Sequence, residues 1–240
     1  MARYQTKLIE KREIAEGTMA FRFEKPADFM FKAGQHIDIV FENPVKTDEK
    51  GNGRDLSIAS APHEPWLEVA TRMTSSAFKE NLKNTPIGTE LLVKGPGGDF
   101  MLHSDSARPA VFLIGGIGIT PIRSIILDAA HRRLSHQLTL FYSNRTPETT
   151  AYWQDLVEAA KANSNFKLVG TMTNINSSAS PWNEAREPLS KEFLQEHLQG
   201  GHTPVYYLAG PETMVKAMRE LAVSLGTDDL SIRAEEFPGY

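Results

Sequence analysis

The sequence predicts two domains: an N-terminal antiparallel β-barrel and a C-terminal α/β domain built on a five-stranded parallel sheet. Before residue 105 the chain holds short segments of alternating or β-branched residues, separated by Gly, Pro and Asn, which are typical of antiparallel strands. After residue 109, strand-like and helix-like segments alternate, which is typical of a parallel sheet. A polar stretch ending in Pro109 lies between the two patterns, so we predict domains over 1–104 and 105–240.

The first domain is predicted to contain six strands and one helix. The strands are expected at 7–14, 18–24, 35–41, 54–60, 67–73 and 90–94. A helix is expected over 76–82, where the hydroxyl of Ser75 or Ser76 can cap its N-terminus.

The second domain is predicted to alternate five strands with four helices. The strands are expected at 110–114, 137–143, 167–171, 205–209 and 231–236, and the helices at 121–134, 149–162, 191–198 and 212–225. Residues 174–188 form a connection long enough to be a lid, although they can equally be a loop without a role.

Composition excludes several classes of protein. The net charge is −4 and basic residues alternate with acidic ones, which argues against nucleic acid as a partner. No apolar run is long enough to span a membrane, and residues 1–13 are too polar and too acidic for a signal peptide, so we expect a cytoplasmic protein without membrane insertion. The chain has no cysteine and its seven histidines are scattered, so we expect no iron–sulfur cluster, no disulfide and no metal site.

The most informative motif is a glycine turn that follows apolar residues 111–114. It contains Gly115, Gly116 and Gly118, then Thr120 and Pro121, with Pro121 suited to helix position N1. Such a turn presents backbone N–H groups to a phosphate, and glycine lets a pyrophosphate approach the main chain closely. The spacing differs from G-x-G-x-x-G, and no acidic residue follows about 20 positions later. The alternative is that the glycines only tighten a strand–helix connection.

Five short motifs occur in one order along the chain: Arg54-Asp55-Leu56-Ser57, Ser76, the turn from Gly115 to Pro121, Gly210-Pro211, and Glu235-Glu236-Phe237. Over essentially its whole length the chain therefore resembles the ferredoxin-NADP(+) reductase superfamily of flavin reductases. The resemblance implies FAD on the barrel and NADPH, with NADH possible, on the α/β domain.

The resemblance also implies roles for the barrel residues. Arg54 would bind the FAD pyrophosphate together with the helix that opens at Ser76, and Ser57 would point its hydroxyl at the flavin N5. Leu56 departs from the family, where a Tyr packs against the flavin, and Ala209 stands where many relatives have Cys. The further FAD-binding candidates are Asp55, Leu56, Thr71, Met73 and Ser75.

The C-terminal segment supplies the remaining flavin contacts. Glu235 is the carboxylate that would relay a proton toward Ser57, so Ser57, Glu235 and Phe237 are the catalytic candidates. Phe237 matches the stacking aromatic of the family by register and Tyr240 by position. The alternative is a C-terminal strand that only docks its aromatic residues into the barrel cleft.

Nucleotide preference is expected to depend on the residues after the second strand of the parallel sheet. Ser143, Asn144 and Arg145 offer donors and a cation in place of an acidic residue, which favours NADPH over NADH. Tyr152 is a candidate to stack on adenine. Gly210 and Pro211 would hold the nucleotide together with the Gly115 turn.

The implied activity is hydride transfer between NAD(P)H and FAD, with single electrons passing to a separate acceptor such as ferredoxin or flavodoxin. Ferric-chelate, free-flavin and oxygenase-component reductases on the same fold are alternatives. A different class is an FAD-containing electron-transfer or regulatory subunit that does not use NAD(P)H.

Overall fold

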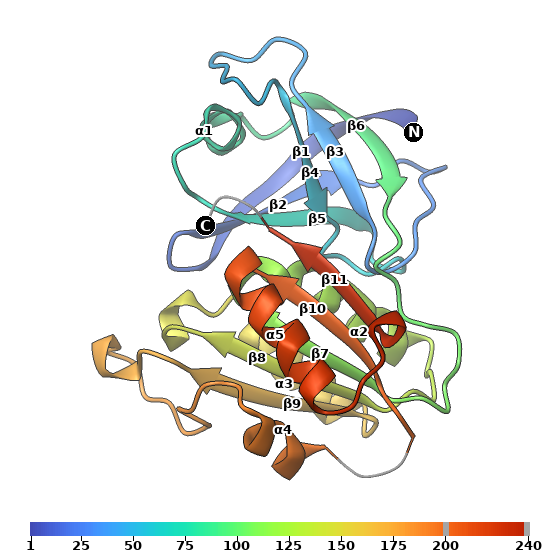
Figure 1. Ribbon diagram of the computed structural model, residues 1–240. Coiled ribbons are helices and arrows are strands. Elements are labelled where there is room, and N and C mark those ends of the chain that lie inside the picture. Colours follow the sequence, from blue (N-terminus) through green and yellow to red (C-terminus); the bar gives the residue numbers. More distant parts are fainter. Residues whose placement is uncertain (199–201, 238–240) are drawn as a thin grey trace.

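The computed structural model describes residues 1–198 and 202–237, and it contains the two sheets that the sequence predicts. Figure 1 shows the antiparallel sheet above the α/β sheet, with the long helix α2 between them. The last strand of the first sheet ends at Gly97 and the first strand of the second begins at Ala110. The exact boundary after residue 104 stays a prediction.

The N-terminal domain is an antiparallel barrel. Its strands follow the order β4-β3-β6-β1-β2-β5, and the Ile58–Val69 bridge joins the two ends of this order, so the sheet closes on itself. Apolar side chains of alternate residues fill the interior, and Phe78 and Leu82 of helix α1 add to that core. The elements are β1 Ala2–Ala15, β2 Thr18–Glu24, β3 His36–Val40, β4 Gly53–Ser57, β5 Trp66–Arg72, α1 Ala77–Asn84 and β6 Glu90–Gly97.

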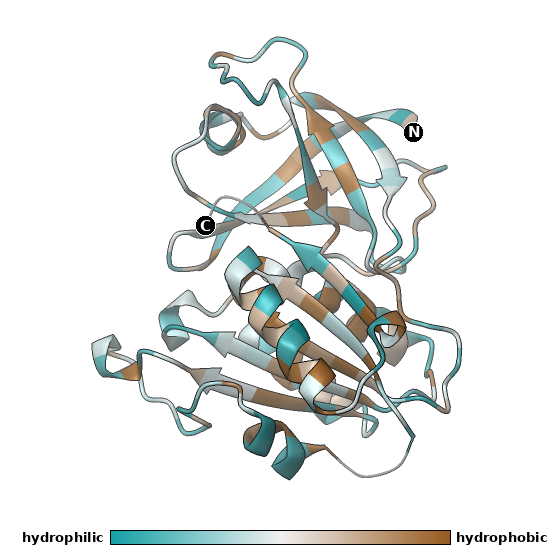
Figure 2. Cartoon of the chain, viewed as in Figure 1, coloured by the Kyte–Doolittle hydropathy of each residue, from teal (hydrophilic) through white to brown (hydrophobic). Residues whose placement is uncertain are grey.

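The C-terminal domain has a parallel sheet in the order β11-β10-β7-β8-β9. Its central strands β7 and β10 are largely brown in Figure 2, because both faces of the sheet are covered there, whereas the edge strand β11 carries teal, hydrophilic residues. The strands are β7 Ala110–Gly115, β8 Leu138–Asn144, β9 Phe166–Met172, β10 Val205–Gly210 and β11 Ile232–Glu236. The helices are α2 Ile119–His131, α3 Trp153–Ala162, α4 Lys191–His197 and α5 Glu212–Ser224, with short 3₁₀ turns η1 Gly116–Gly118, η2 Pro147–Thr149, η3 Ile175–Ser177 and η4 Asp229–Ser231.

The strand order determines where a ligand can enter this sheet. From β7 the chain passes to β8 and β9 on one side, then returns to β10 and β11 on the other. The order therefore reverses between β7 and β10, and open α/β sheets bind ligands beside the carboxyl ends of the strands at such a point. Those carboxyl ends carry Gly115 and Gly210.

Two local predictions are wrong in detail. Helix α2 begins at Ile119, so Pro121 is its third residue instead of its first; proline is still accommodated there because N–H groups of the first turn have no intrahelical partner. The helix predicted from residue 149 begins at Trp153, after η2 and a left-handed Tyr152 with φ of 59°. No helix in residues 1–198 or 202–237 combines the length and apolar character needed to cross a membrane.

Candidate active site

Two glycine motifs nearly 100 residues apart pack backbone against backbone at the reversal point. A Cβ on Gly118 would lie 2.4 Å from the carbonyl oxygen of Ala209, and a Cβ on Gly210 would lie 3.2 Å from that of Gly115. Gly116 has φ of 52° and Gly210 φ of 154°, a region that disfavours other residues. These glycines are thus required for close approach as well as for backbone conformation.

A cavity of about 570 Å³ opens beside this contact. The sequence-predicted residues that line it are Gly115, Gly116, Ser143, Asn144, Arg145 and Pro211. Glu16, Thr18 and Arg72 line it from the barrel, so the cavity lies where the two domains meet. An apolar end formed by Pro188, Leu189, Met214, Met218 and Leu221 was not predicted. Its signal in the sequence was only the helical spacing of 214, 218 and 221, which equally describes an ordinary buried helix face.

The polar end of the cavity has an unsatisfied donor. Asn144 is buried, and within the described part of the chain its Nδ2 has no hydrogen-bond partner. Its backbone carbonyl accepts from the N–H of Thr173 at 2.9 Å, which fixes the strand end. Ser143 is also buried, whereas Arg145 is exposed. A buried amide without a partner fits a polar ligand that supplies an acceptor.

Five other predicted nucleotide residues do not line this cavity: Gly118 and Gly210, which make the backbone contact beside it, and Thr120, Pro121 and Tyr152. Thr120 is buried and its hydroxyl donates to the carbonyl of Ile117 at 3.1 Å, and Pro121 is buried in the first turn of α2. Both residues therefore stabilise the backbone that follows the glycine turn. Tyr152 is 5% exposed, and its hydroxyl donates to Glu68 Oε1 on the barrel at 2.7 Å. The structure therefore directs the Tyr152 ring into the domain interface and away from the cavity.

Arg54 and the N-terminus of α1 already bind an anion, which is a carboxylate of the protein itself. Asp48 Oδ1 accepts from Arg54 Nη2 at 2.7 Å, and Asp48 Oδ2 accepts from the backbone N–H of Ala77 at 3.2 Å. The hydrogen bond from Arg54 lowers the pKa of Asp48. Asp48 was not predicted, because a polar loop six residues before Arg54 carries no sequence signal of this contact.

Further positive charge gathers at this anion site. Burial lowers the pKa of Lys79, and the nearby charges of Arg54, Lys50 and Arg72 lower it further. Ser76 is the N-cap residue of α1, but its side chain makes no capping hydrogen bond, and Ser75 is exposed. A cation, a helix N-terminus and additional basic residues form a donor set that suits phosphate groups, so the residues present fit the pyrophosphate of FAD.

Ser57 and Glu235 meet across the domain interface. The Ser57 hydroxyl lies 3.4 Å from Glu235 Oε1 and 3.5 Å from Oε2, although the two residues are 178 positions apart. Burial, together with the charge of Asp99, raises the pKa of Glu235 to about 7, against the opposing hydrogen bond from Ser57. A carboxyl with this pKa both holds and releases a proton near neutral pH.

Phe237 follows directly after this pair. Its N–H donates to the carbonyl of Gly210 at 3.0 Å, and its side chain packs against the hydrophobic cluster that the two domains share. Tyr240, the second aromatic candidate, lies outside the described residues.

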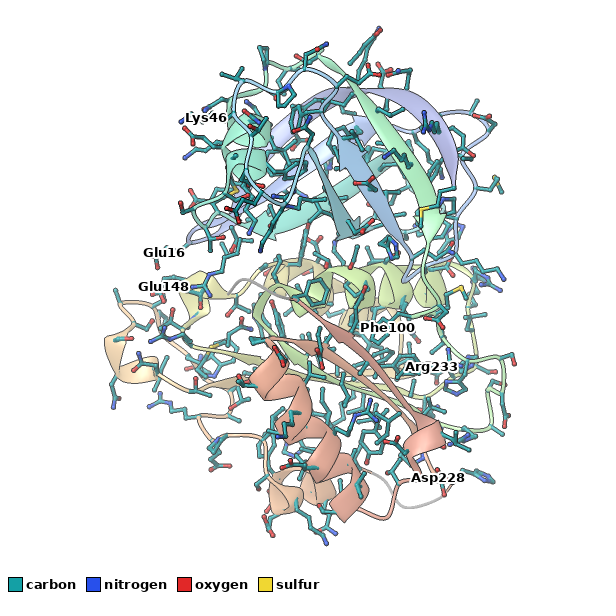
Figure 3. The ribbon with its side chains drawn as sticks, turned by 45° about the horizontal axis from the view of Figure 1, so that its top comes forward. Glu16, Lys46, Phe100, Glu148, Asp228 and Arg233 are labelled. Atoms are coloured by element: carbon teal, nitrogen blue, oxygen red, sulfur yellow. The ribbon has the colours of Figure 1, made fainter. Side chains whose placement is uncertain are left out.

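The other flavin-binding candidates lie on β4 and β5 or just after them. Asp55 is exposed, with its carboxylate 3.9 Å from His36 Nε2, and Leu56 and Met73 pack against the barrel core. Thr71 is buried. Figure 3 shows side chains of both domains meeting along the boundary above α2. The structure thus brings Ser57, Glu235 and the glycine turns together at this boundary.

Comparison with known proteins agrees with this arrangement. Residues 112–220 match the family model of the oxidoreductase NAD-binding domain. The glycine betaine monooxygenase reductase subunit of Chromohalobacter salexigens is 26% identical over 92% of this chain, which spans 60% of that relative's length. Ferredoxin–NADP reductase B of Sorangium cellulosum is 27% identical, with 91% of each chain covered.

A solved ferredoxin NADP+ reductase from Neisseria gonorrhoeae, with bound FAD and NADP, shares the fold with a TM-score of 0.79 at 20% identity and 98% coverage of both chains. A barrel followed by an NAD-binding α/β domain, with a polar site at their junction, defines the class of two-domain oxidoreductases. Within that class, the chain is similar in sequence to reductases of the ferredoxin-NADP(+) reductase superfamily and shares their fold.

Proposed function

We propose that this protein is an FAD-dependent NAD(P)H oxidoreductase that passes electrons to a separate redox acceptor. The observation that carries the proposal is the Ser57–Glu235 pair, which lies across the domain interface. Glu235 pairs with Ala209 of the adjacent strand β10, and Ala209 contacts Gly118 of the glycine turn beside the cavity. When bound, FAD would supply this site with a group able to take hydride from NAD(P)H and give up electrons one at a time.

The barrel residues would bind and orient the flavin. Arg54 and the N-terminus of α1 would exchange the Asp48 carboxylate for the FAD pyrophosphate, since both groups accept hydrogen bonds from the same donors. Leu56 would provide an apolar wall, and Phe237 would cover the opposite face of the ring. Ser57 would donate its hydroxyl toward the flavin N5.

Glu235 would hold the proton that accompanies electron transfer. With a pKa of about 7, its carboxyl can supply a proton through the Ser57 hydroxyl or take one back. Its partly buried position limits exchange of that proton with water.

The nucleotide would lie in the cavity between Gly115 and Leu221. Its pyrophosphate would lie against the backbone of Gly115 and Gly116, which line the cavity, and Asn144 offers the unpaired amide. Ser143, Asn144 and Arg145 provide donors and a cation suited to a 2′-phosphate, which supports NADPH as the preferred donor.

The proposed acceptor is a one-electron carrier such as ferredoxin or flavodoxin. The name of the Sorangium relative, which this chain matches over nearly its full length, supports that choice. The glycine betaine monooxygenase and terephthalate dioxygenase reductases among the relatives support an oxygenase component as the second candidate acceptor.

Anaerobic titration with NADPH and NADH tests the proposal. Purified protein saturated with FAD should lose its absorbance near about 450 nm on addition of either nucleotide, with the smaller half-saturating concentration for NADPH. Persistent oxidised absorbance with both nucleotides would instead favour a subunit that does not use NAD(P)H. Mixing the reduced protein with ferredoxin, flavodoxin or an oxygenase component then identifies the acceptor.

A further inference from the structure

Tyr152, which does not reach the cavity, belongs to a buried polar network that joins the two domains. Its hydroxyl donates to Glu68 Oε1 on β5 at 2.7 Å. The Glu68 side chain is fully buried and also accepts from Arg12 Nη2, at 2.9 and 2.7 Å, and from Arg22. This carboxylate is therefore surrounded by donors from both domains.

Arg123 of helix α2 makes a second set of contacts across the same interface. It is 5% exposed, and its Nη1 donates to the carbonyl of Ala59 at 2.8 Å and to Glu64 Oε2 at 3.2 Å, both on the barrel. Its Nε donates to Asp155 Oδ2 of its own domain at 2.8 Å. Burial alone would lower its pKa, but Glu64, Tyr152, Asp155 and Glu68 raise it above its usual value.

Ser124 adds a third connection. Its buried hydroxyl donates to the carbonyl of Ser60 at 2.7 Å. The guanidinium carbon of Arg123 also lies 4.9 Å from the centre of the Tyr152 ring, so the two sets of contacts touch each other.

The backbone conformation of Tyr152 indicates that contacts of its side chain hold it in place. It has φ of 59°, in the left-handed region, which is strained for a bulky residue and persists only if its surroundings require it. The surroundings here are the Glu68 carboxylate and the Arg123 guanidinium.

The residues that make these contacts lie only a few positions along the chain from Ser57 on the barrel and from the glycine turn on the α/β domain. Ala59 and Ser60 follow Ser57 by two and three residues, and Arg123 follows Gly118 by five, within the first turns of α2. In Figure 3, α2 runs along the boundary between the domains. Any rotation of one domain against the other would break these buried hydrogen bonds and leave the carboxylate of Glu68 with fewer donors.

We infer that Glu68, Arg123 and Tyr152, with Ser124, are positioning residues that fix the distance between the Ser57 side of the site and the glycine turn. This inference rests on the proposed function, because the distance it fixes is the one between flavin and nicotinamide. Domain motion is the default between two domains unless their interface is large and hydrophobic. Here the domains share an apolar cluster, and the buried hydrogen bonds of this network fix their orientation within it.

The first experiment measures domain orientation without reference to activity. The chain has no cysteine, so Val45→Cys on the barrel and Leu230→Cys on the α/β domain, which are 94% and 93% exposed, accept spin labels selectively. Pulsed electron–electron distance measurements on the FAD-saturated protein should give one narrow distribution, and Tyr152→Phe combined with Glu68→Gln should broaden it. Tyr206→Phe, which removes a buried hydroxyl that contacts Thr227 within one domain, is the matched control and should leave it narrow. A broad distribution in the parent, or no change in the double variant, would overturn the inference.

The second experiment measures hydride transfer by stopped flow. In Tyr152→Phe, flavin reduction at saturating NADPH should slow by roughly tenfold, since small misplacements of reacting groups are costly. KM and flavin content should change less than about twofold, and the isotope effect with nicotinamide deuterated at C4 should rise, because hydride transfer becomes rate-limiting. Lower thermal stability with an unchanged reduction rate and isotope effect would make the network merely structural. If the parent is not reduced by either nucleotide, the proposed function fails, while the distance measurement still decides whether the domains are fixed.

Discussion

The carboxyl of Glu235 should give the stability of this protein a pH dependence that Glu235→Gln abolishes. Burial, as the largest cause, raises its pKa from 4.5 to about 7. One pKa unit corresponds to about 1.4 kcal/mol, so this group changes the free energy of unfolding by at most about 3 kcal/mol. Between pH 4.5 and 7 the folded protein retains a proton that the unfolded chain has released. The contribution is therefore fully present below the unfolded pKa and is lost as the pH rises toward 7.

Urea unfolding of the parent and of Glu235→Gln between about pH 5 and pH 8.5 measures this effect as a difference, so that groups common to both proteins cancel. The variant should gain stability relative to the parent as the pH rises, by up to about 3 kcal/mol, with no further change above about pH 8. Glu236→Gln, at the exposed neighbouring carboxylate, is the control and should show no such trend. A stability difference for Glu235→Gln that does not vary with pH would refute the argument that burial raises this pKa.

Three further substitutions test other parts of the site. Arg54→Ala should weaken FAD binding by more than roughly tenfold in equilibrium dialysis, because hydrogen bonds to charged groups contribute about 1.5–3 kcal/mol, and unchanged flavin content would contradict the phosphate assignment. Gly118→Ala places a Cβ 2.4 Å from the carbonyl oxygen of Ala209 and should cost about 2 kcal/mol; an unaltered Tm would show that the turn can open. Arg145→Asp should raise the KM for NADPH by roughly tenfold or more and leave that for NADH within about twofold, whereas equal changes for both nucleotides would remove Arg145 from 2′-phosphate recognition.

The pattern of the sequence was sufficient for the architecture. The period-two alternation before residue 105 and the strand–helix alternation after it predicted a barrel and a five-stranded parallel sheet, and both are confirmed. The boundaries of α2 and α3 were wrong by a few residues because they depend on 3₁₀ turns and on the left-handed Tyr152, which propensity does not reveal.

Long-range contacts limited the prediction of the site. The motif order suggested that Ser57 and Glu235 would meet, and the structure brings their side chains together. Nothing in the sequence indicated that Asp48 binds Arg54 or that Tyr152 binds Glu68. Each contact depends on how segments pack in three dimensions, which the types of the neighbouring residues do not indicate. Tyr152 in particular was a candidate to stack on adenine, yet its buried hydroxyl donates to Glu68 of the other domain.

By itself, the sequence determined which segments form strands and helices, the absence of thiol chemistry, and the glycines needed for two tight turns. These are local properties, since periodicity, residue chemistry and backbone freedom act over a few neighbouring residues. Only the tertiary structure decided that Asp48 accepts a hydrogen bond from Arg54 and that burial raises the pKa of Glu235. It also decided that the hydroxyl of Tyr152 donates to Glu68 of the other domain. Those outcomes depend on burial and on charges brought together from distant parts of the chain, which exist only once both domains have packed.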